Sequence, residues 1–86
     1  MSPMNKVMVE VLLPASGEIY DVRIPLDSQI GEITILIMKQ LEALSNGRFI
    51  ANNSTILCDG LSGQILDINK FAAELDIKNG SKLMLI

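Results

Sequence analysis

Two alternating runs of apolar and polar residues stand close together near the start of the chain. In residues 6–13 the apolar residues recur at every second position, a period that predicts a β-strand. Residues 18–24 alternate in the same way around Asp21 and Arg23, and residues 14–17 between the runs contain a proline and a glycine. Two such runs joined by a short turn predict a β-hairpin. One face of this hairpin is apolar, so the rest of the chain must cover it.

Only one later segment has a long helical period. Asp27 or Ser28 is expected to cap the first amide groups of this helix. Asn46 and Gly47 are expected to end it, because both residues tolerate a left-handed backbone. The apolar residues recur at spacings of three and four over residues 30–44, and they are Ile30, Ile33, Ile37, Leu41 and Leu44.

The remaining strands are predicted to be short. Residues 55–58 form a third strand, with Ile56 directed into the core, and residues 64–66 form a very short fourth strand. The last strand, residues 81–86, follows an Asn-Gly turn at residues 79–80, which is a strong two-residue turn signal.

Two further apolar contacts are expected outside these strands. Residues 70–75 suggest one helical turn, held inward by Phe71 or Leu75, and Phe49 and Ile50 are expected to fold back as a hydrophobic anchor.

The order strand, strand, helix, strand, short strand, strand predicts an α+β fold. A mixed sheet of four to five strands with one main helix across it buries the apolar faces of both. This is the β-grasp arrangement. With 86 residues the chain is too short for two cores, so residues 6–86 are expected to form a single domain, preceded by a flexible tail at residues 1–5.

Composition excludes several kinds of chemistry. The sequence has no histidine and a single cysteine, Cys58, which argues against imidazole catalysis, an internal disulfide and a thiolate metal cage. We therefore expect no enzyme activity and no cofactor or metal. The net charge is -3, and the 7 basic residues are scattered, so nucleic acid is not an expected partner. The sequence shows no signal segment and no membrane-spanning run, which favours a cytosolic protein without direct membrane insertion.

Two stretches of the sequence resemble a known family. Residues 17–25, Gly-Glu-Ile-Tyr-Asp-Val-Arg-Ile-Pro, and residues 75–86, with an Ile-x-Asn-Gly turn and an apolar last strand, are similar to the YukD/EsaB-type proteins. These are small ubiquitin-like proteins encoded with bacterial type VII secretion systems. The ubiquitin-like resemblance covers roughly residues 6–86. It implies a β-grasp fold and a docking or regulatory role toward a protein partner, such as a membrane component of the secretion apparatus.

The end of the sequence departs from that of ubiquitin. Conjugated modifiers and sulfur carriers end in a flexible Gly-Gly tail, whereas this sequence stops at Ile86, in or next to the predicted last strand, without a glycine pair. We therefore expect a non-conjugating module.

The same alternation predicts an apolar surface on the sheet face turned away from the helix. In a ubiquitin-like sheet the first, last and third strands are neighbours, so their outward residues would form one partner-binding patch. The alternative is a set of scattered surface apolar residues. The residues predicted on this face are Met8, Leu12, Leu57, Met84 and Ile86.

The helix offers a possible second interface at Ile35 and Met38, which lie off the core stripe. The alternative is a wide core stripe, with Met38 covered by residues 49–50. A second function class follows from this surface or from the last strand: self-association as a homo-oligomeric structural or adaptor protein unrelated to secretion.

Overall fold

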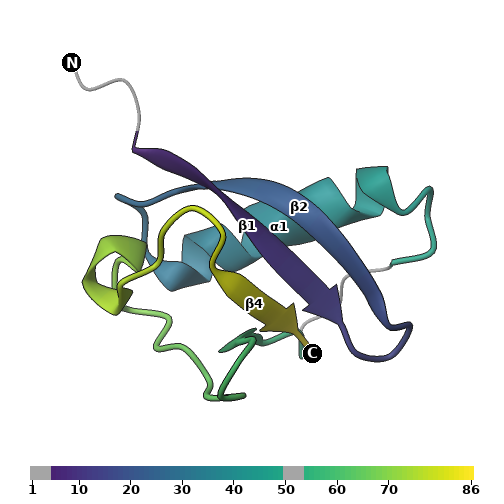
Figure 1. Ribbon diagram of the computed structural model, residues 1–86. Helices are drawn as coiled ribbons and strands as arrows, with labels where there is room; N and C mark the ends of the chain where they lie inside the picture. Colours follow the sequence, from purple (N-terminus) through teal and green to yellow (C-terminus); the bar gives the residue numbers. More distant parts are fainter. Residues whose placement is uncertain (1–4, 50–53) are drawn as a thin grey trace.

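The computed structural model describes residues 5–49 and 54–86 (Figure 1). Residues 1–4 of the expected tail and Ile50 of the expected anchor lie outside this part of the chain, whereas Asn5 accepts a hydrogen bond from the N–H of Leu26 at 2.6 Å. The elements in chain order are β1 (Lys6–Leu13), β2 (Glu18–Pro25), α1 (Ile30–Leu44), β3 (Leu57–Asp59), the 3-10 helix η1 (Ala72–Leu75) and β4 (Lys82–Leu85).

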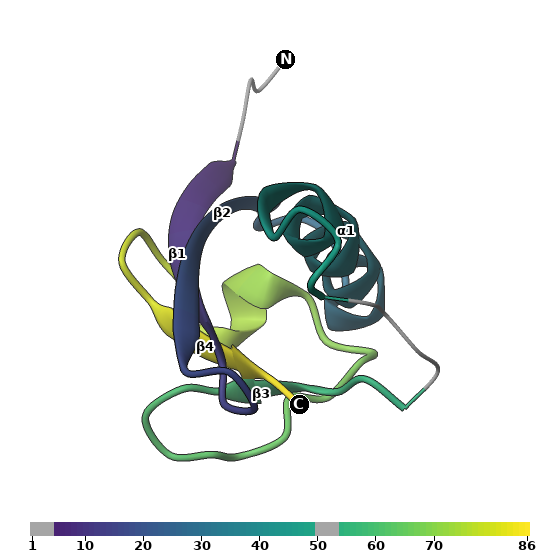
Figure 2. The same cartoon turned by 90° about the vertical axis from the view of Figure 1, so that its right-hand side faces the viewer.

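The strands form a mixed four-stranded sheet in the order β2-β1-β4-β3. The β1–β2 and β3–β4 pairs are antiparallel, whereas β1 and β4 are parallel. Helix α1 covers one face of the sheet, and the other face is open (Figure 2). The predicted α+β, β-grasp architecture is confirmed. The expected fourth short strand is reduced to an isolated bridge between Ile65 and Cys58.

The core lies between the sheet and α1. Every second residue of β1 points into it, and Ile30, Ile33, Ile37 and Leu41 of α1 are fully buried, as their spacing predicts. Leu44 was expected in the same stripe, but its side chain is 51% exposed. The helix ends at this residue, and the buried Ser45 takes the inward position, with its hydroxyl accepting the N–H of Phe49 at 2.9 Å.

The N-cap of the helix lies one residue after Ser28 and two residues after Asp27, the two predicted caps. Its N-cap is Gln29, whose backbone N–H donates to the carboxylate of Glu32 at 3.4 Å. Ser28 is held in the preceding loop, where its carbonyl accepts the N–H of Ala72. The predicted stop is confirmed, because Asn46 and Gly47 both have positive φ, 54° and 85°.

Strand β3 begins two residues and ends one residue later than predicted, and its two faces are exchanged. Ile56 was expected in the core but is 40% exposed, and Leu57 was expected on the open face but is buried. Both orientations were predicted wrongly. The strand has three residues, so alternation alone cannot fix its phase, and a shift of one residue exchanges the two faces. Pairing with β4 fixes it, since Leu57 stands opposite the buried Leu85.

The helical turn before β4 is held by small and aliphatic side chains. Ala72 is fully buried and Leu75 packs against the core, whereas Phe71 is 43% exposed. The expected turn at residues 79–80 is present, with Gly80 at φ 85°. The side-chain oxygen of Asn79 accepts the N–H of Met8 at 2.9 Å, which ties this turn to β1.

Gly60 gives a direct test of the packing between β3 and β4. A Cβ at this position would lie 2.8 Å from the carbonyl carbon and oxygen of Lys82. We expect Gly60→Ala to lower the free energy of unfolding by about 2 kcal/mol, measured by urea denaturation. The control is Gly31→Ala, where the nearest atom would lie at an ordinary 3.5 Å and alanine favours the helix by up to about 1 kcal/mol. An equal decrease in the free energy of unfolding in the two variants would contradict the close packing of Gly60 against the backbone of Lys82.

Candidate functional site

The open face of the sheet carries a row of apolar residues that crosses all four strands. Directly paired residues share a face, so the pairing defines the row. Ile19 of β2 stands opposite Leu12 of β1, Leu12 opposite Met84 of β4, and Met84 opposite Cys58 of β3. The bridge from Cys58 to Ile65 extends the row beyond β3. Residues from four separate parts of the chain therefore meet along one line.

A second apolar pair lies beside this row. Ile56 and Ile86 exchange two backbone hydrogen bonds, of 2.7 and 2.9 Å, and each stands two residues from a member of the row. Since side chains alternate along a strand, both lie on the open side. Together these residues form the open-face patch, whose exposed or half-buried members are Leu12, Ile19, Ile56, Ile65, Met84 and Ile86.

The structure brings together only part of the predicted site. Leu12, Met84 and Ile86 are in the open-face patch, but Leu57 is in the core and leaves the site. Met8 is 39% exposed on the same face, yet Glu10 and Lys82 stand between it and the patch, joined by an ion pair of 3.1 Å. This charged pair forms a polar border on that side.

Sequence reasoning missed Ile19, Ile56 and Ile65. Ile19 alternates with Tyr20 and Val22, so the hairpin pattern itself contained the signal for its outward position. Ile65 had no such signal, because its place depends on the course of the loop after β3.

Cys58 lies within the row but is fully buried. The loop after β3 folds back over it, with hydrogen bonds from Leu66 N–H to the Leu57 carbonyl at 3.1 Å and from Asp59 N–H to the Gln64 carbonyl at 2.8 Å. Figure 2 shows this loop extending toward the open side of the sheet. Burial raises the pKa of the Cys58 thiol, which favours the protonated form. A protonated, covered thiol is a poor nucleophile and a poor metal ligand.

The turn of this loop is fixed by Asp59. Its carboxylate accepts the backbone N–H groups of Ser62 at 2.7 Å and of Leu61 at 3.0 Å. The hydrogen bonds from Ser62, followed by that from Leu61, lower the pKa of Asp59. The turn therefore positions Ile65 beside Cys58.

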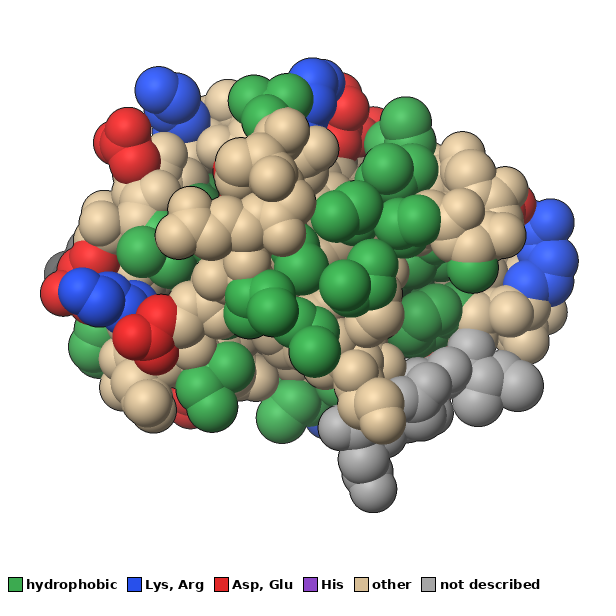
Figure 3. Space-filling model, turned by 90° about the horizontal axis from the view of Figure 1, so that it is seen from below, with side chains coloured by type: hydrophobic (Ala, Val, Ile, Leu, Met, Phe, Trp, Pro, Cys, Tyr) green, Lys and Arg blue, Asp and Glu red, His purple; other side chains and the backbone are tan. Residues whose placement is uncertain are grey.

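The possible second interface borders a groove on the helix side. A cavity of about 400 Å³ lies between α1 and residues 55–68, and Ile35, Met38, Ile56 and Ile65 are among the residues that line it. Ile35 is 51% exposed, whereas Met38 is half-buried and packs against the core. Figure 3 shows hydrophobic side chains gathered on the face seen from below, with charged side chains mainly toward its margins.

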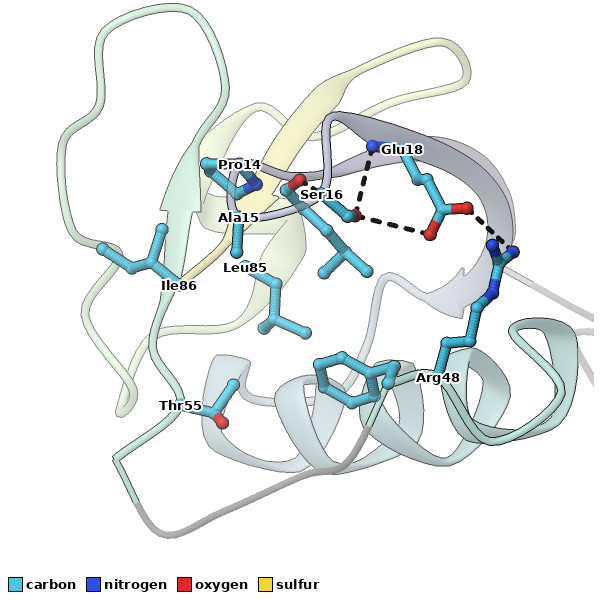
Figure 4. A pocket seen from close by; sticks show the side chains of 10 residues that line it. Pro14, Ala15, Ser16, Glu18, Arg48, Thr55, Leu85 and Ile86 are labelled. Carbon is cyan, nitrogen blue, oxygen red and sulfur yellow. Dashed lines mark hydrogen bonds and ion pairs between the residues drawn. The ribbon is translucent and has the colours of Figure 1, made fainter.

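A larger hollow of about 630 Å³ lies at the turn of the hairpin (Figure 4). Leu13, Phe49 and Leu85 contribute apolar walls, and Arg48 and Glu18 form an ion pair of 2.8 Å at its rim. The Tyr20 hydroxyl donates to the same Glu18 carboxylate, which raises the pKa of Tyr20. Because the rim charges pair with each other, the hollow suits an apolar side chain better than an ion.

Two structural observations bear on other classes of site. In residues 5–49 and 54–86, no group of three or more acidic or cysteine side chains is placed to hold a metal ion. Over the same described ranges, no helix has the length and apolar character needed to cross a bilayer.

Comparisons with known proteins support the fold. No protein-family model matches the chain, and no curated protein matches it. Among solved structures, the chain is similar to the ubiquitin-like domain of the Mycobacterium tuberculosis type VII secretion system protein ECCD1. The TM-score is 0.76 at 14% identity, covering 96% of this chain and 99% of that one. A designed protein based on ubiquitin gives a TM-score of 0.68 at 17% identity, covering 95% of this chain and 88% of that one.

A third similar structure is a much longer chain. It belongs to the MycP5-free ESX-5 inner membrane complex, with a TM-score of 0.72 and 19% identity. The match covers 95% of this chain but only 21% of that one. At these identities the similarity shows a ubiquitin-like β-grasp fold. The narrower YukD/EsaB assignment remains a prediction.

The burial of Cys58 predicts a protected thiol. In the native protein at pH 8, we expect Cys58 to react with a disulfide reagent such as dithionitrobenzoate at least about 100-fold more slowly than in urea-unfolded protein, because the covering loop must open first. The liberated thionitrobenzoate gives the rate. Equally fast labelling in both states would contradict the covering of the thiol and reopen a carrier or nucleophile role.

The hydrogen bonds of Asp59 predict a dependence of stability on pH. A carboxylate with a lowered pKa in the folded state stabilises above its unfolded pKa of about 3.9, and this contribution is lost as the pH falls through the folded value. We expect Asp59→Asn to be less stable than wild type at pH 7 and the gap to narrow below pH 4. Urea denaturation at pH 7 and pH 3 measures the difference in unfolding free energy between the two proteins. A difference that is the same at both pH values would contradict a stabilising role of the Asp59 carboxylate.

Proposed function

We propose that this chain is a ubiquitin-like protein-binding module that acts as a cytosolic accessory or regulator of a bacterial type VII secretion system. The open-face patch carries the binding part of the proposal. The link to secretion is supported by the similar folds of the ECCD1 ubiquitin-like domain and of the ESX-5 chain, and by the resemblance of residues 17–25 and 75–86 to YukD/EsaB-type proteins.

The exposure of the patch supports a binding role. Ile19, Ile65 and Ile86 are 60%, 62% and 54% exposed, although an isoleucine gains about 1.5–3 kcal/mol when it is fully buried. Their alignment on one face, bordered by the Glu10–Lys82 ion pair, has the apolar centre and polar border of a protein interface. The partner in this proposal is a membrane component of the secretion apparatus.

A homo-oligomeric structural or adaptor protein is the second candidate function. The exposed Ile35 beside the helix-side groove is the observation that favours it. The last strand cannot supply a free edge for self-association, because β4 lies between β1 and β3. Sedimentation at micromolar concentration separates the two candidates, since a strict monomer excludes the oligomer.

Single substitutions in the open-face patch test the proposal. We expect Met84→Asp and Ile65→Asp each to reduce retention of solubilised secretion-machinery components on the immobilised protein by roughly tenfold or more, because a carboxylate in an apolar interface is desolvated without a partner. Quantitative immunoblotting of the eluate measures the retention.

The matched control is Leu44→Asp, at a 51% exposed leucine at the end of α1 and outside the patch, which should leave retention unchanged. Circular dichroism confirms that each variant is folded. Leu57→Asp is unsuitable because Leu57 is in the core. Wild-type retention by both patch variants would exclude the open face as the docking surface.

A further inference from the structure

The sequence contains two Asn-Gly pairs, at residues 46–47 and 79–80, and both lie in turns exposed to water. Such a pair has a reactivity of its own. The main-chain nitrogen of the glycine can attack the side-chain amide carbon of the asparagine, because a glycine has no Cβ to obstruct the approach. Since both pairs are accessible to water, their hydrogen bonds decide how fast each one reacts.

Residues 79–80 are held at both reacting groups. The N–H of Gly80, which carries the attacking nitrogen, donates to the Met8 carbonyl at 2.8 Å. The side-chain oxygen of Asn79, on the carbon that would be attacked, accepts the N–H of Met8 at 2.9 Å. Ring closure at this pair requires both bonds to break. A reaction that needs a local opening is slowed in proportion to the rarity of the open state.

Residues 46–47 are held less firmly. Within residues 5–49 and 54–86, no hydrogen bond reaches the side chain of Asn46. The N–H of Gly47 donates to the Glu42 carbonyl at 3.3 Å, which is long for such a bond. Asn46 also has a positive φ, 54°, a conformation that is unfavourable for a residue with a Cβ. Ring closure requires Asn46 to leave this conformation, and the change therefore needs little free energy.

The reaction needs no reagent other than water. The Gly47 nitrogen bonds to the side-chain amide carbon of Asn46 and loses its proton to solvent, while the bond from that carbon to its NH2 group breaks and ammonia leaves. Water then opens the cyclic imide at one of its two carbonyls. Hydrolysis at the side-chain carbonyl gives aspartate. Hydrolysis at the main-chain carbonyl gives isoaspartate, in which the chain continues through the side-chain carbon and is longer by one methylene.

The extra methylene of isoaspartate would fall inside a turn that positions part of the hollow at the hairpin. The Ser45 carbonyl accepts the N–H of Arg48 at 3.2 Å, and the Ser45 hydroxyl accepts that of Phe49 at 2.9 Å. Both bonds close over residues 46–47, so a longer chain there does not preserve their geometry. Arg48 forms the ion pair with Glu18 at the rim of the hollow (Figure 4), and Phe49 is one of its apolar walls.

We propose that Asn46 is a site of spontaneous deamidation through a cyclic imide with Gly47, and that the isoaspartate product releases Arg48 and Phe49 from the hollow at the hairpin turn. Asn79 is protected from the same reaction by its bonds with Met8. The modification needs no partner protein, so it does not depend on the proposed function.

Peptide mapping measures both sites in one sample. The folded protein is incubated at pH 8 and 37 °C and digested with trypsin, which leaves the two pairs in separate peptides, residues 40–48 and 79–82. We expect Asn46 to convert at least roughly tenfold faster than Asn79, because two short hydrogen bonds must open at the second site. Mass spectrometry detects the replacement of NH2 by OH. Similar rates at the two sites in the folded protein would overturn the proposal.

Unfolded protein is the control for the sequence around each pair. In guanidinium chloride both pairs lose their hydrogen bonds, so the two rates should agree within about threefold. A tenfold difference that persists there would be due to the neighbouring residues and would overturn the structural protection of Asn79.

The variant Asn46→Gly assigns the mass change to one residue. Glycine keeps the left-handed turn and removes the reactive amide, while Gln40 stays in the same peptide. We expect no mass change in residues 40–48 of this variant. A mass change that remains would place the reaction at Gln40 and exclude Asn46.

The isoaspartate form, isolated by chromatography, tests the effect on the hollow. Its Phe49 amide, no longer held by the Ser45 hydroxyl, should exchange with solvent roughly tenfold faster than in the unmodified protein, and the Met8 amide should be unchanged. The matched control is Asn46→Asp, which adds the negative charge without the extra methylene and should leave exchange at Phe49 as in wild type. Wild-type exchange at Phe49 in the isoaspartate form, or equally fast exchange in Asn46→Asp, would contradict release by the longer chain.

Discussion

The parallel pairing of β1 with β4 is the contact on which the rest of the structure depends. It joins residues about seventy positions apart and places Val11 beside Leu83 in the core and Leu12 beside Met84 on the open face. The chain must cross the sheet to make this contact, and α1 lies in that connection. The same pairing therefore creates the interior and assembles the apolar surface opposite to it. Neither β3 nor the returning loop would have a place in the sheet without β4 as neighbour.

The reliability of the sequence reasoning depended on the length of each element. The long alternating and helical patterns predicted β1, β2 and α1, because many apolar residues in each pattern lie on the same face. Short elements carried too little information: β3 has three residues, and the wrong phase exchanged Ile56 with Leu57. The cap of α1 was also misplaced, since a hydrogen bond between the Ser28 carbonyl and η1 decides where the loop ends.

The residues of the candidate site also differ in how well the sequence predicted them, depending on whether they lie in a long strand or in a loop. Leu12, Met84 and Ile86 could be assigned to one surface from alternation and strand order alone. Ile65 could not be assigned to this surface from the sequence. Its position depends on the turn at Asp59 and on the loop that covers Cys58, and both depend on contacts across the sheet. Conversely, Met8 has the right phase, but the Glu10–Lys82 pair separates it from the patch. Alternation along a strand predicts which face of the sheet a side chain occupies. Whether the residues on that face form one continuous surface depends on the side chains of the adjacent strands.

Ile56 and Ile65 have a position with consequences for how ligands combine. They belong to the open-face patch and also line the groove beside α1, so the two surfaces meet at these side chains. A ligand that buries them from one side removes part of the contact area available from the other. Binding at the two surfaces is then thermodynamically linked with a negative sign, and by reciprocity each ligand weakens the other to the same degree. A domain of this kind exchanges one ligand for another more readily than it bridges them.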